Sequence, residues 1–439
     1  DFGNDVIGNE QQNVLETTIA TIGKILAQES DSITTQTIDI VVEKTNPNDL
    51  NVICDELNYN TTQNVAYRNN HRWVDFYENL QVVEKPTTTI EAEKVYLITG
   101  GLGFLGRTLA AHLTQKFNAK VVLTGRQELP KEELWDTYTN EDSATARKIE
   151  TLKELRKEVY YYPLDLTDPE SVTETVALIE SNVGAISGVI HAAGNIDNQT
   201  FKFIENIDLE SIHAQFDPKI KGTINIAKAF ENSELDFVWI ASSLASILGG
   251  LSYGAYATAN KFIDAFVQKE TNWLSVNLDG LGKGAMEDYQ ITELFEQTLH
   301  YKFLKQCVVS MKNPNAILAA QNQPKEIEDT TTSDAKATSR KANYEEPNTE
   351  TEKSLAKIWE DFFGYNQISI AENFFELGGD SLKAMTIIKR IQKHYNVEIS
   401  LLDFFSKPSI KELSGEIDIA LQVNKPSTEN EKRTNVIKI

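Results

Sequence analysis

VYLITGGLGFLG, the stretch at residues 95–106, decides the fold of this chain. Its first half is an apolar run rich in β-branched residues, and its second half places glycines at 100, 103 and 106 ahead of a helical pattern. A strand that turns directly into a helix in this way brings the backbone close to a pyrophosphate and points free helix N–H groups at it. We therefore predict a dinucleotide site that includes Thr99, Gly100, Gly103, Leu105 and Gly106.

Short apolar runs of the same kind recur downstream, with helical patterns between most of them. Alternating strands and helices predict a parallel sheet covered on both faces, which is a Rossmann-like, doubly wound α/β domain. Ligands of such a sheet bind at the carboxyl ends of its strands. The strands that we expect lie at residues 94–99, 120–124, 158–162, 188–191, 236–241 and 274–277.

Arg126 follows the second expected strand, where a site for NAD usually has an acidic residue that holds the ribose 2′-hydroxyl. A guanidinium suits a 2′-phosphate, so this residue favours NADPH over NADH. Ala192 and Ala193 follow the fourth strand and are small enough to let the nicotinamide and its ribose lie close to the backbone. His191 just before them is interpreted as a structural residue at a strand end rather than as a general base.

Asp165 and Leu166 follow the third expected strand and complete the predicted cofactor site. The Asp165 carboxylate can accept a hydrogen bond from the adenine amine. Alternatively, Thr167 or Asp168 simply caps the next helix, and the two interpretations are compatible.

Four polar residues are the candidates for catalysis. Ser243 follows the fifth expected strand, and Tyr256 and Asn260 follow it in a helical pattern, four residues apart. Because positions i and i+4 share a helix face, Tyr256 and Asn260 can face one site. Lys219 lies upstream in the segment FDPKIKG, residues 216–222.

These motifs together resemble the ketoreductase domains of modular polyketide and nonribosomal peptide synthetases, which belong to the short-chain dehydrogenase/reductase superfamily. The resemblance covers residues 92–310 and rests on TGGLGFLG at 99–106, HAAG at 191–194, PKIKG at 218–222 and the Ser–Tyr–Asn spacing. It implies that Tyr256 donates the proton, that Ser243 orients the carbonyl, and that Lys219 and Asn260 support the active-site network.

The chemistry agrees with those roles, because hydride addition to a ketone builds negative charge on its oxygen. A tyrosine hydroxyl can give a proton to that oxygen, a nearby ammonium lowers the tyrosine pKa, and a serine hydroxyl donates a second hydrogen bond. Lys221 and Tyr253 are competing candidates that break the family spacing.

The sequence departs from the family pattern at three places. Gln127 stands where a second basic residue often follows Arg126. The segment at 196–198, Ile-Asp-Asn, only partly matches the Leu-Asp-Asp of one product class, and Leu248 replaces the tryptophan of the other class. The first product class is therefore favoured.

Residues 1–90 resemble the structural subdomain that precedes such catalytic domains, and we expect them to be scaffolding rather than catalytic. A helix is predicted from Val14 to Leu26, and strands are predicted at Thr37–Val42 and Asn51–Cys54. Two further segments, at 66–68 and 72–74, match the final strands of that subdomain.

Residues 353–420 resemble a phosphopantetheine carrier domain, which is a small helical bundle. The segment NFFELGGDSL at 373–382 carries the resemblance, and it implies that Ser381 bears a 4′-phosphopantetheine arm. The polar stretch at 322–352 predicts a flexible linker, and the polar tail spans 421–439. The expected domains are therefore 1–90, 91–321 and 353–420.

The resemblance implies an NADPH-dependent ketoreductase that acts on a ketoacyl group tethered to its own carrier. The Gly-Gly-Asp before Ser381 is closer to the peptide-synthetase type, which favours reduction of an α-ketoacyl to an α-hydroxyacyl thioester in depsipeptide synthesis. The alternative is a β-ketoacyl reductase of a polyketide or hybrid module. A decayed, non-catalytic scaffold and a free-standing dehydrogenase are the other classes considered. The partners implied are a phosphopantetheinyl transferase and neighbouring adenylation or ketosynthase and condensation domains.

Composition excludes several other classes of protein. With 42 basic and 65 acidic residues the formal net charge is −23, which disfavours nucleic acid and anionic membrane as partners. The two cysteines fit a reducing compartment, so we expect a cytoplasmic location. The six histidines form no metal-binding pattern, and no metal is expected. Because the chain starts at Asp1, we interpret it as a piece of a longer polypeptide.

Overall fold

The structure is a computed structural model that falls into two compact units, Asp1–Lys325 and Glu326–Ile439. It describes residues 6, 10, 13–30, 32–41, 48–58, 64–69, 71–138, 143–155, 159–281, 286–322, 344–363, 365, 367–374, 377, 381–395, 397, 399, 404 and 407–423.

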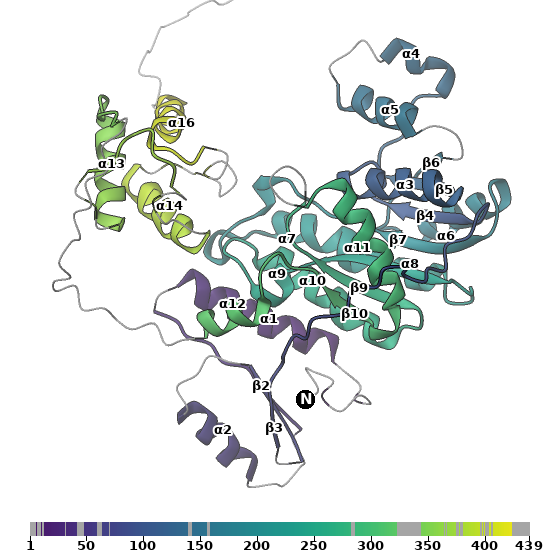
Figure 1. Cartoon of the computed structure of the whole chain (residues 1–439), viewed down its shortest axis with the longest axis horizontal. Helices are drawn as coiled ribbons and strands as arrows, with labels where there is room; N and C mark the ends of the chain where they lie inside the picture. The colour runs from purple at the N-terminus through teal and green to yellow at the C-terminus, as the bar shows by residue number, and fades with distance from the viewer. Residues whose placement is uncertain are drawn as a thin grey trace, which may run out of the picture. The chain divides into compact units, whose positions relative to one another are not determined.

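The first unit is built on a seven-stranded, wholly parallel sheet with the strand order β10-β9-β8-β7-β4-β5-β6 (Figure 1). The chain moves outward from β4 to β6 and then crosses to the other side of β4 to form β7. The crevice between the ends of β4 and β7 is therefore the topological switch point, where ligands of such sheets bind. The strands are β4 (Val95–Thr99), β5 (Lys120–Gly125), β6 (Val159–Pro163), β7 (Ile186–His191), β8 (Phe237–Ser243), β9 (Trp273–Leu278) and β10 (Gln306–Val308).

Alternate residues of each strand enter different cores because successive side chains point to opposite faces. On β4, Tyr96 and Ile98 belong to one core and Val95 and Leu97 to the other. The first core lies against α3 (Phe104–Phe117) and α11 (Asp288–His300), and the second lies against α6 (Pro169–Asn182), α8 (Gly222–Ala229) and α10 (Gly254–Phe266). The predicted doubly wound α/β fold is thus confirmed, with every expected strand present.

The short edge strand β10 was not expected from the sequence, because its three residues give too little pattern to recognise. Further helices described after β4 are α4 (Trp135–Tyr138), α5 (Ala144–Leu155), α7 (Leu209–Phe216), α9 (Ala245–Leu248) and α12 (Pro314–Gln321).

The N-terminal part contains α1 (Val14–Glu29) and a small sheet of β1 (Ile38–Ile40), β2 (Val65–Arg68) and β3 (His71–Trp73). The prediction of a strand at Asn51–Cys54 is wrong, because these residues lie within helix α2 (Asn48–Asn58). The β-branched pair Val52-Ile53 suggested a strand, whereas the apolar spacing of Leu50, Ile53 and Leu57 is helical.

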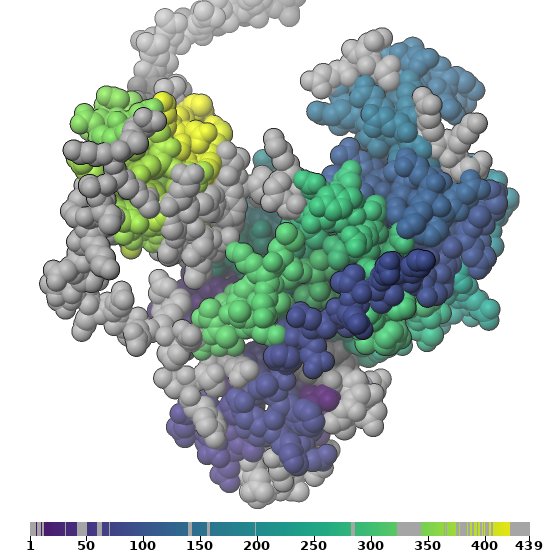
Figure 2. Space-filling view, viewed as in Figure 1, coloured from purple at the N-terminus to yellow at the C-terminus, as the bar shows by residue number. Residues whose placement is uncertain are grey.

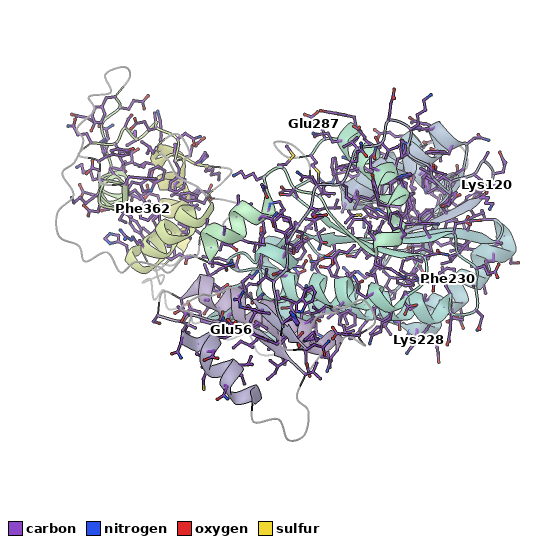
Figure 3. The ribbon with its side chains drawn as sticks, turned by 60° about the horizontal axis from the view of Figure 1, so that its bottom comes forward. Glu56, Lys120, Lys228, Phe230, Glu287 and Phe362 are labelled. Carbon is purple, nitrogen blue, oxygen red and sulfur yellow. The ribbon has the colours of Figure 1, made fainter. Side chains whose placement is uncertain are left out.

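Ion pairs with buried carboxylates join the strands of this small sheet to one another and to neighbouring segments. Arg68, which is 5% exposed, pairs with Asp39 at 3.1 Å and also with Glu10. Glu56 of α2, labelled in Figure 3, is fully buried and accepts hydrogen bonds from the Arg72 guanidinium and the Tyr67 hydroxyl. The charge of each carboxylate is thus compensated by a close donor, as burial requires.

Residues 74–90 have no regular structure and run across α11 and α12 as a band (Figure 2). The Gln297 side chain bonds both the N–H and the carbonyl of Val83, and Asn315 does the same for Tyr77. This band therefore joins the N-terminal part to the helices that follow β9.

The second unit is a small helical bundle of α13 (Glu350–Phe363), α14 (Ser381–Tyr395) and α16 (Ile410–Val423) around one core. Trp359, Phe374 and Phe404 are fully buried there, with ring centroids 4.9–6.1 Å apart. A helical carrier-like bundle is confirmed.

Parts of the remaining predictions fall outside the described residues. These are most of the linker (323–343), the polar tail from 424 onward, and residues 375, 376 and 378–380 of the carrier motif. Among the described residues, no helix has the length and apolar character that crossing a membrane demands, and no group of His, Cys, Asp or Glu is arranged to hold a metal ion.

Candidate functional site

The glycine turn after β4 leaves no space for side chains. Gly100 has φ +68°, and a Cβ on it would lie 2.7 Å from the Cα of Ala193, at the end of β7. A Cβ on Gly106 would lie 2.6 Å from the Cα of Gly101. The turn, the start of α3 and the end of β7 therefore meet backbone to backbone, which only glycine permits at these positions.

Helix α3 begins above this turn with an N-terminus free to bind an anion. Its N-cap residue, Gly103, makes no side-chain cap hydrogen bond, and the first turn holds no acidic residue. Free N–H groups and the positive end of the helix dipole attract phosphate. Together with the side-chain-free turn at Gly100, this geometry fits the pyrophosphate of a dinucleotide. Leu105, on the first turn of α3, is buried in the core beneath.

Arg126 and Asp165 lie beyond the ends of β5 and β6, on the side of the crevice expected for the adenosine. Arg126 is exposed. The Asp165 carboxylate accepts hydrogen bonds from the backbone N–H and the hydroxyl of Thr167, at 2.9 and 2.8 Å. These bonds, and the charge of Arg126, hold the pKa of Asp165 below its ordinary value. The cap of α6 is Asp168, which accepts from the Glu170 N–H.

Leu166 and Ala192 each make one backbone contact that fixes their position. The Leu166 carbonyl accepts a hydrogen bond of 2.8 Å from the Asn225 side chain, and the Ala192 N–H continues the strand pairing to the Thr99 carbonyl at 3.0 Å. Ala192 is thus fixed beside the end of β4, and Leu166 is held against α8.

His191 is fully buried at the end of β7, and its Nδ1 lies 2.6 Å from the Thr99 hydroxyl. Burial lowers the pKa of His191 to about 3, and the nearby Lys219 ammonium acts in the same direction. The imidazole is therefore neutral at physiological pH. A neutral ring bonded between two strand ends has the structural role that the sequence suggested.

Tyr256, Ser243 and Asn260 come together beside the switch point. Ser243 is the last residue of β8, and Tyr256 and Asn260 lie on the first turns of α10. Burial raises the pKa of the Tyr256 hydroxyl, and the polar side chains of Ser243 and Asn260 oppose that rise. The phenol is thus protonated near neutral pH, as a proton donor must be.

Asn260 is fully buried and donates through Nδ2 to the Tyr256 carbonyl at 2.8 Å. Its Oδ1 is buried and has no hydrogen-bond partner among the described residues. A buried acceptor of this kind requires a donor, such as a water molecule or a bound group.

Lys219 lies in a π-helical turn (Asp217–Lys221) and is 5% exposed. Among the described contacts, its ammonium donates to the Ala241 carbonyl at 2.5 Å, on the strand that ends in Ser243, and not to the Tyr256 phenol. Burial lowers the pKa of Lys219 to about 8, and the charge of Asp264 opposes this. The competing candidate Lys221 is half exposed and pairs with Asp217 at 2.8 Å.

Sequence reasoning missed a buried network behind Ser243. The Asp264 carboxylate, 2% exposed, accepts hydrogen bonds from Ser246, Ser275 and Asn277, with Asn277 Nδ2 at 2.7 Å. The same Asn277 Nδ2 lies 3.2 Å from the Ser243 carbonyl oxygen. Asp264 continues the four-residue spacing of Tyr256 and Asn260 on α10, and that spacing was the available signal.

Two aromatic rings flank the Tyr256 phenol. The ring centroids of Phe201 and Tyr253 lie 5.4 and 5.7 Å from that of Tyr256, and 5.3 Å from each other. Tyr253, the other competing candidate, is therefore a packing partner of Tyr256.

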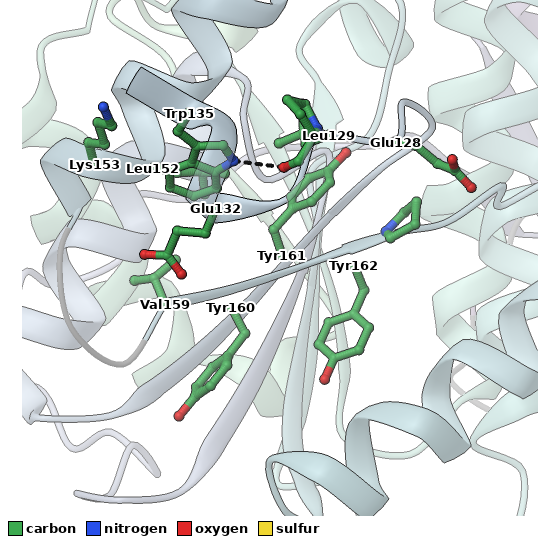
Figure 4. Close-up of a pocket in the computed structure, with 12 residues that line it drawn as sticks. Glu128, Leu129, Glu132, Trp135, Leu152, Lys153, Val159, Tyr160, Tyr161 and Tyr162 are labelled. Carbon is green, nitrogen blue, oxygen red and sulfur yellow. Dashed lines mark hydrogen bonds between the residues drawn. The ribbon is translucent and has the colours of Figure 1, made fainter. Parts of the chain in front are cut away.

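A separate hollow of about 980 Å³ lies between β6 and the α4–α5 region (Figure 4). Tyr160, Tyr161 and Tyr162 line it, together with Trp135, whose indole N–H donates to the Pro130 carbonyl at 2.8 Å. None of its lining residues belongs to the candidate catalytic or cofactor set, so it lies apart from the site described above.

In the second unit, Ser381 is the first residue of α14. The segment that carries the sequence motif thus ends at a helix N-terminus, although Gly378, Gly379 and Asp380 are outside the described residues.

Models of two protein families match the chain, one in each unit. A model of the KR domain matches residues 94–277, and a model of the phosphopantetheine attachment site matches residues 353–417. Both matches confirm the resemblance inferred from the motifs.

Similar curated proteins are much longer than this chain, which spans about a tenth of the length of two such relatives. Polyketide synthase PksM of Bacillus subtilis (strain 168) is 27% identical over 394 residues, which is 82% of this chain and 9% of that protein. The 6-methylsalicylic acid synthase of Penicillium patulum is 31% identical over 225 residues, covering 49% of this chain and 12% of that protein.

Two solved structures show the same fold. An N-terminal ketoreductase from the macrolactin assembly line has 25% identity and a TM-score of 0.56, covering 72% of this chain and 64% of that one. An adenylation, ketoreductase and pseudo-Asub structure of a keto acid-selecting nonribosomal peptide synthetase module has 21% identity and a TM-score of 0.58. That match covers 74% of this chain and 29% of that one.

Proposed function

We propose that this chain, a ketoreductase domain joined to a phosphopantetheine carrier domain of the modular polyketide and nonribosomal peptide synthase family, reduces a carrier-tethered ketoacyl thioester to a hydroxyacyl thioester. The ketoacyl group is held on a 4′-phosphopantetheine arm on Ser381, which a phosphopantetheinyl transferase attaches. The loading and condensing steps belong to neighbouring synthase domains.

Each polar residue has one task in this reaction. The Ser243 hydroxyl donates a hydrogen bond to the ketone oxygen and stabilises the charge that develops there. Tyr256 gives its phenolic proton to that oxygen, so the C=O group becomes CH–OH and the thioester is untouched. Bound NADPH supplies the hydride that reduces the carbonyl carbon. Lys219 and Asn260 support the network, and Tyr256 regains its proton from solvent.

The observation that carries this proposal is the convergence of Ser243, Tyr256 and Asn260 at the strand ends, next to a glycine turn fitted to a pyrophosphate. A scaffold without catalytic function has no requirement for a buried phenol gathered with a serine hydroxyl and an asparagine amide at the same strand ends. The carrier domain in the same chain disfavours a free-standing dehydrogenase.

We assign the α-ketoacyl thioester as the substrate class, which places the chain in depsipeptide synthesis. The support is the Gly-Gly-Asp-Ser sequence at 378–381, which resembles peptide-synthetase carriers. The second candidate is a β-ketoacyl thioester, supported by the polyketide synthases among the similar proteins.

Matched substrates separate these two candidates. The chain is loaded on Ser381 with an α-ketoacyl or a β-ketoacyl pantetheine of equal length, and NADPH oxidation and the mass of the tethered acyl group are followed. We expect the tethered α-ketoacyl group to gain two hydrogens. The Ser381→Ala variant should carry no ketoacyl pantetheine.

Preferred reduction of the β-ketoacyl group would assign the chain to a polyketide step. The absence of NADPH oxidation with both substrates would contradict reduction of a tethered ketone.

A further inference from the structure

The last two turns of helix α1, in the part of the chain assigned to scaffolding, make hydrogen bonds to the loops around the candidate proton donor. Helix α1 packs along α10 with its buried face, which includes Thr21 and Ile25 (Figure 1). Beyond that face, the Lys24 ammonium donates to the Ile247 carbonyl at 2.7 Å. Gln28 and Glu29 continue these contacts toward the start of α10.

Gln28 holds the turn that leads from α9 into α10. Its side-chain Nε2 donates to the Leu248 carbonyl at 2.8 Å, and its Oε1 accepts from the Gly250 N–H at 2.8 Å. Gly249 and Gly250 have φ +76° and +137°, and a Cβ on Gly249 would collide with Gln28 Oε1. The amide is therefore seated in a space that exists only because residue 249 has no side chain.

Glu29 joins this turn to a second loop. One carboxylate oxygen accepts from the Ser252 N–H at 2.8 Å, and the other accepts from the Ile204 N–H at 2.7 Å. Ser252 has φ +62°, an unfavourable conformation for a residue with a side chain. Such a conformation persists only where surrounding contacts fix it, and Glu29 supplies one of those contacts.

The two loops that Glu29 joins are those that carry the rings beside Tyr256. Tyr253 directly follows Ser252, and Phe201 lies three residues before Ile204. Both rings contact the Tyr256 ring. Movement of either loop would therefore change the surroundings of the phenol, whereas the glycine turn after β4 belongs to other elements.

We propose that Gln28 and Glu29 are positioning residues of the reductase, which fix Phe201 and Tyr253 against Tyr256 and so set how the ketoacyl group reaches the phenol. This inference rests on the proposed function. It gives the N-terminal part a role in substrate placement beyond support of the fold.

The test compares Glu29→Ala and Glu29→Gln with wild type, using Glu16→Gln on the first turn of α1 as the matched control. We measure kcat and KM for the ketoacyl thioester and, separately, the affinity for NADPH from its fluorescence. We expect Glu29→Ala to lower kcat/KM about tenfold, Glu29→Gln to lower it less because one acceptor oxygen remains, and NADPH affinity to stay unchanged. Gln28→Ala should resemble Glu29→Gln.

A double-mutant cycle with Phe201→Ala distinguishes positioning from general destabilisation. If Glu29 acts through the Phe201 loop, Glu29→Ala should have a much smaller effect in the Phe201→Ala background. If Glu29→Ala does not fold, the same cycle is run with Glu29→Gln.

Equal effects in both backgrounds, a parallel loss of NADPH affinity, or kinetics of the Glu29 variants equal to those of Glu16→Gln would overturn the inference while leaving the proposed function intact. A wild-type chain that reduces no ketoacyl thioester would remove the proposed function and this inference with it.

Discussion

At the cofactor end of the site, residues 95–106 supply the strand, the turn and the helix start in one contiguous stretch, and the fit depends on backbone atoms at Gly100 and Gly106. At the reducing end, Lys219, Ser243 and Tyr256 come from a π-helical turn, a strand end and a helix. Side chains from other elements contact these segments, such as Asn277 of β9 at the Ser243 carbonyl and Glu29 of α1 at the Ser252 N–H.

Because of this difference, substitutions at the two ends should have different effects on the kinetics. A substitution at the cofactor end should change NADPH affinity with little effect on the chemical step. A substitution at the reducing end should change kcat, or the response to pH, and leave NADPH affinity as it was.

Apart from Tyr256→Phe, the largest effect is expected for Ser243→Ala. Removal of one donor to a developing oxyanion typically costs about 10²–10³-fold in kcat. We expect a loss of this size in the rate of NADPH oxidation with a ketoacyl thioester, and unchanged NADPH affinity.

Ser187→Ala, near the opposite end of β7, is the matched control and should retain wild-type kcat. A Ser243→Ala variant that loses NADPH affinity instead of kcat would contradict the separate roles of the cofactor end and the reducing end.

Gly100→Ala, in contrast, should weaken NADPH binding and preserve kcat. The new Cβ would meet the Ala193 backbone at 2.7 Å, and the residue would keep φ +68°. Strain and overlap together cost roughly 1–3 kcal/mol, so NADPH affinity should weaken roughly 10- to 100-fold, with kcat preserved at saturating NADPH.

Fluorescence titration with NADPH measures this change. Gly415→Ala, where a Cβ meets nothing within 4 Å, is the control. Wild-type affinity in Gly100→Ala would mean that the turn is not the pyrophosphate site.

Arg126→Ala should raise the KM for NADPH by about tenfold and leave the KM for NADH nearly unchanged. The reason is that a charge-assisted hydrogen bond to the 2′-phosphate is lost, and NADH has no such group. Steady-state kinetics with both cofactors measures the ratio, with Arg147→Ala on the exposed side of α5 as control. An equal effect on both cofactors would argue against contact with the 2′-phosphate.

Asp264→Asn should produce the smallest change, one that depends on pH. The Asp264 charge supports the charged form of Lys219, whose pKa burial has lowered to about 8. Without that charge the lysine pKa falls further, so a step that needs the ammonium is lost at a lower pH. At about pH 8 we expect a roughly two- to fivefold loss of activity, with little change at about pH 6.

A pH–rate profile of kcat measures this shift. A profile that moves to higher pH, or a uniform loss at every pH, would show that Asp264 does not act through Lys219.

Structural features that depend on a local stretch of sequence could be predicted. The strands, the glycine turn and the helix that carries Tyr256 and Asn260 follow from apolar periodicity and glycine spacing, and the helix predicted from Val14 continues to Glu29. The segment at Asn51–Cys54 failed because two adjacent β-branched residues outweighed a helical spacing.

Features that depend on tertiary contacts could not be predicted. Gln28 and Leu248 are 220 residues apart, and Glu29 and Ser252 are 223 residues apart, so no local pattern joins them. Likewise, the Asp264 carboxylate accepts hydrogen bonds from Ser275 and Asn277 only because the fold places β9 beside α10.

The most direct test of the mechanism is the reduction of a ketoacyl thioester by Tyr256→Phe, measured together with NADPH binding. Loss of one hydroxyl should lower kcat by about 10²–10⁴-fold while NADPH still binds as tightly as in wild type. Turnover at the wild-type rate in Tyr256→Phe would contradict the assignment of Tyr256 as the proton donor.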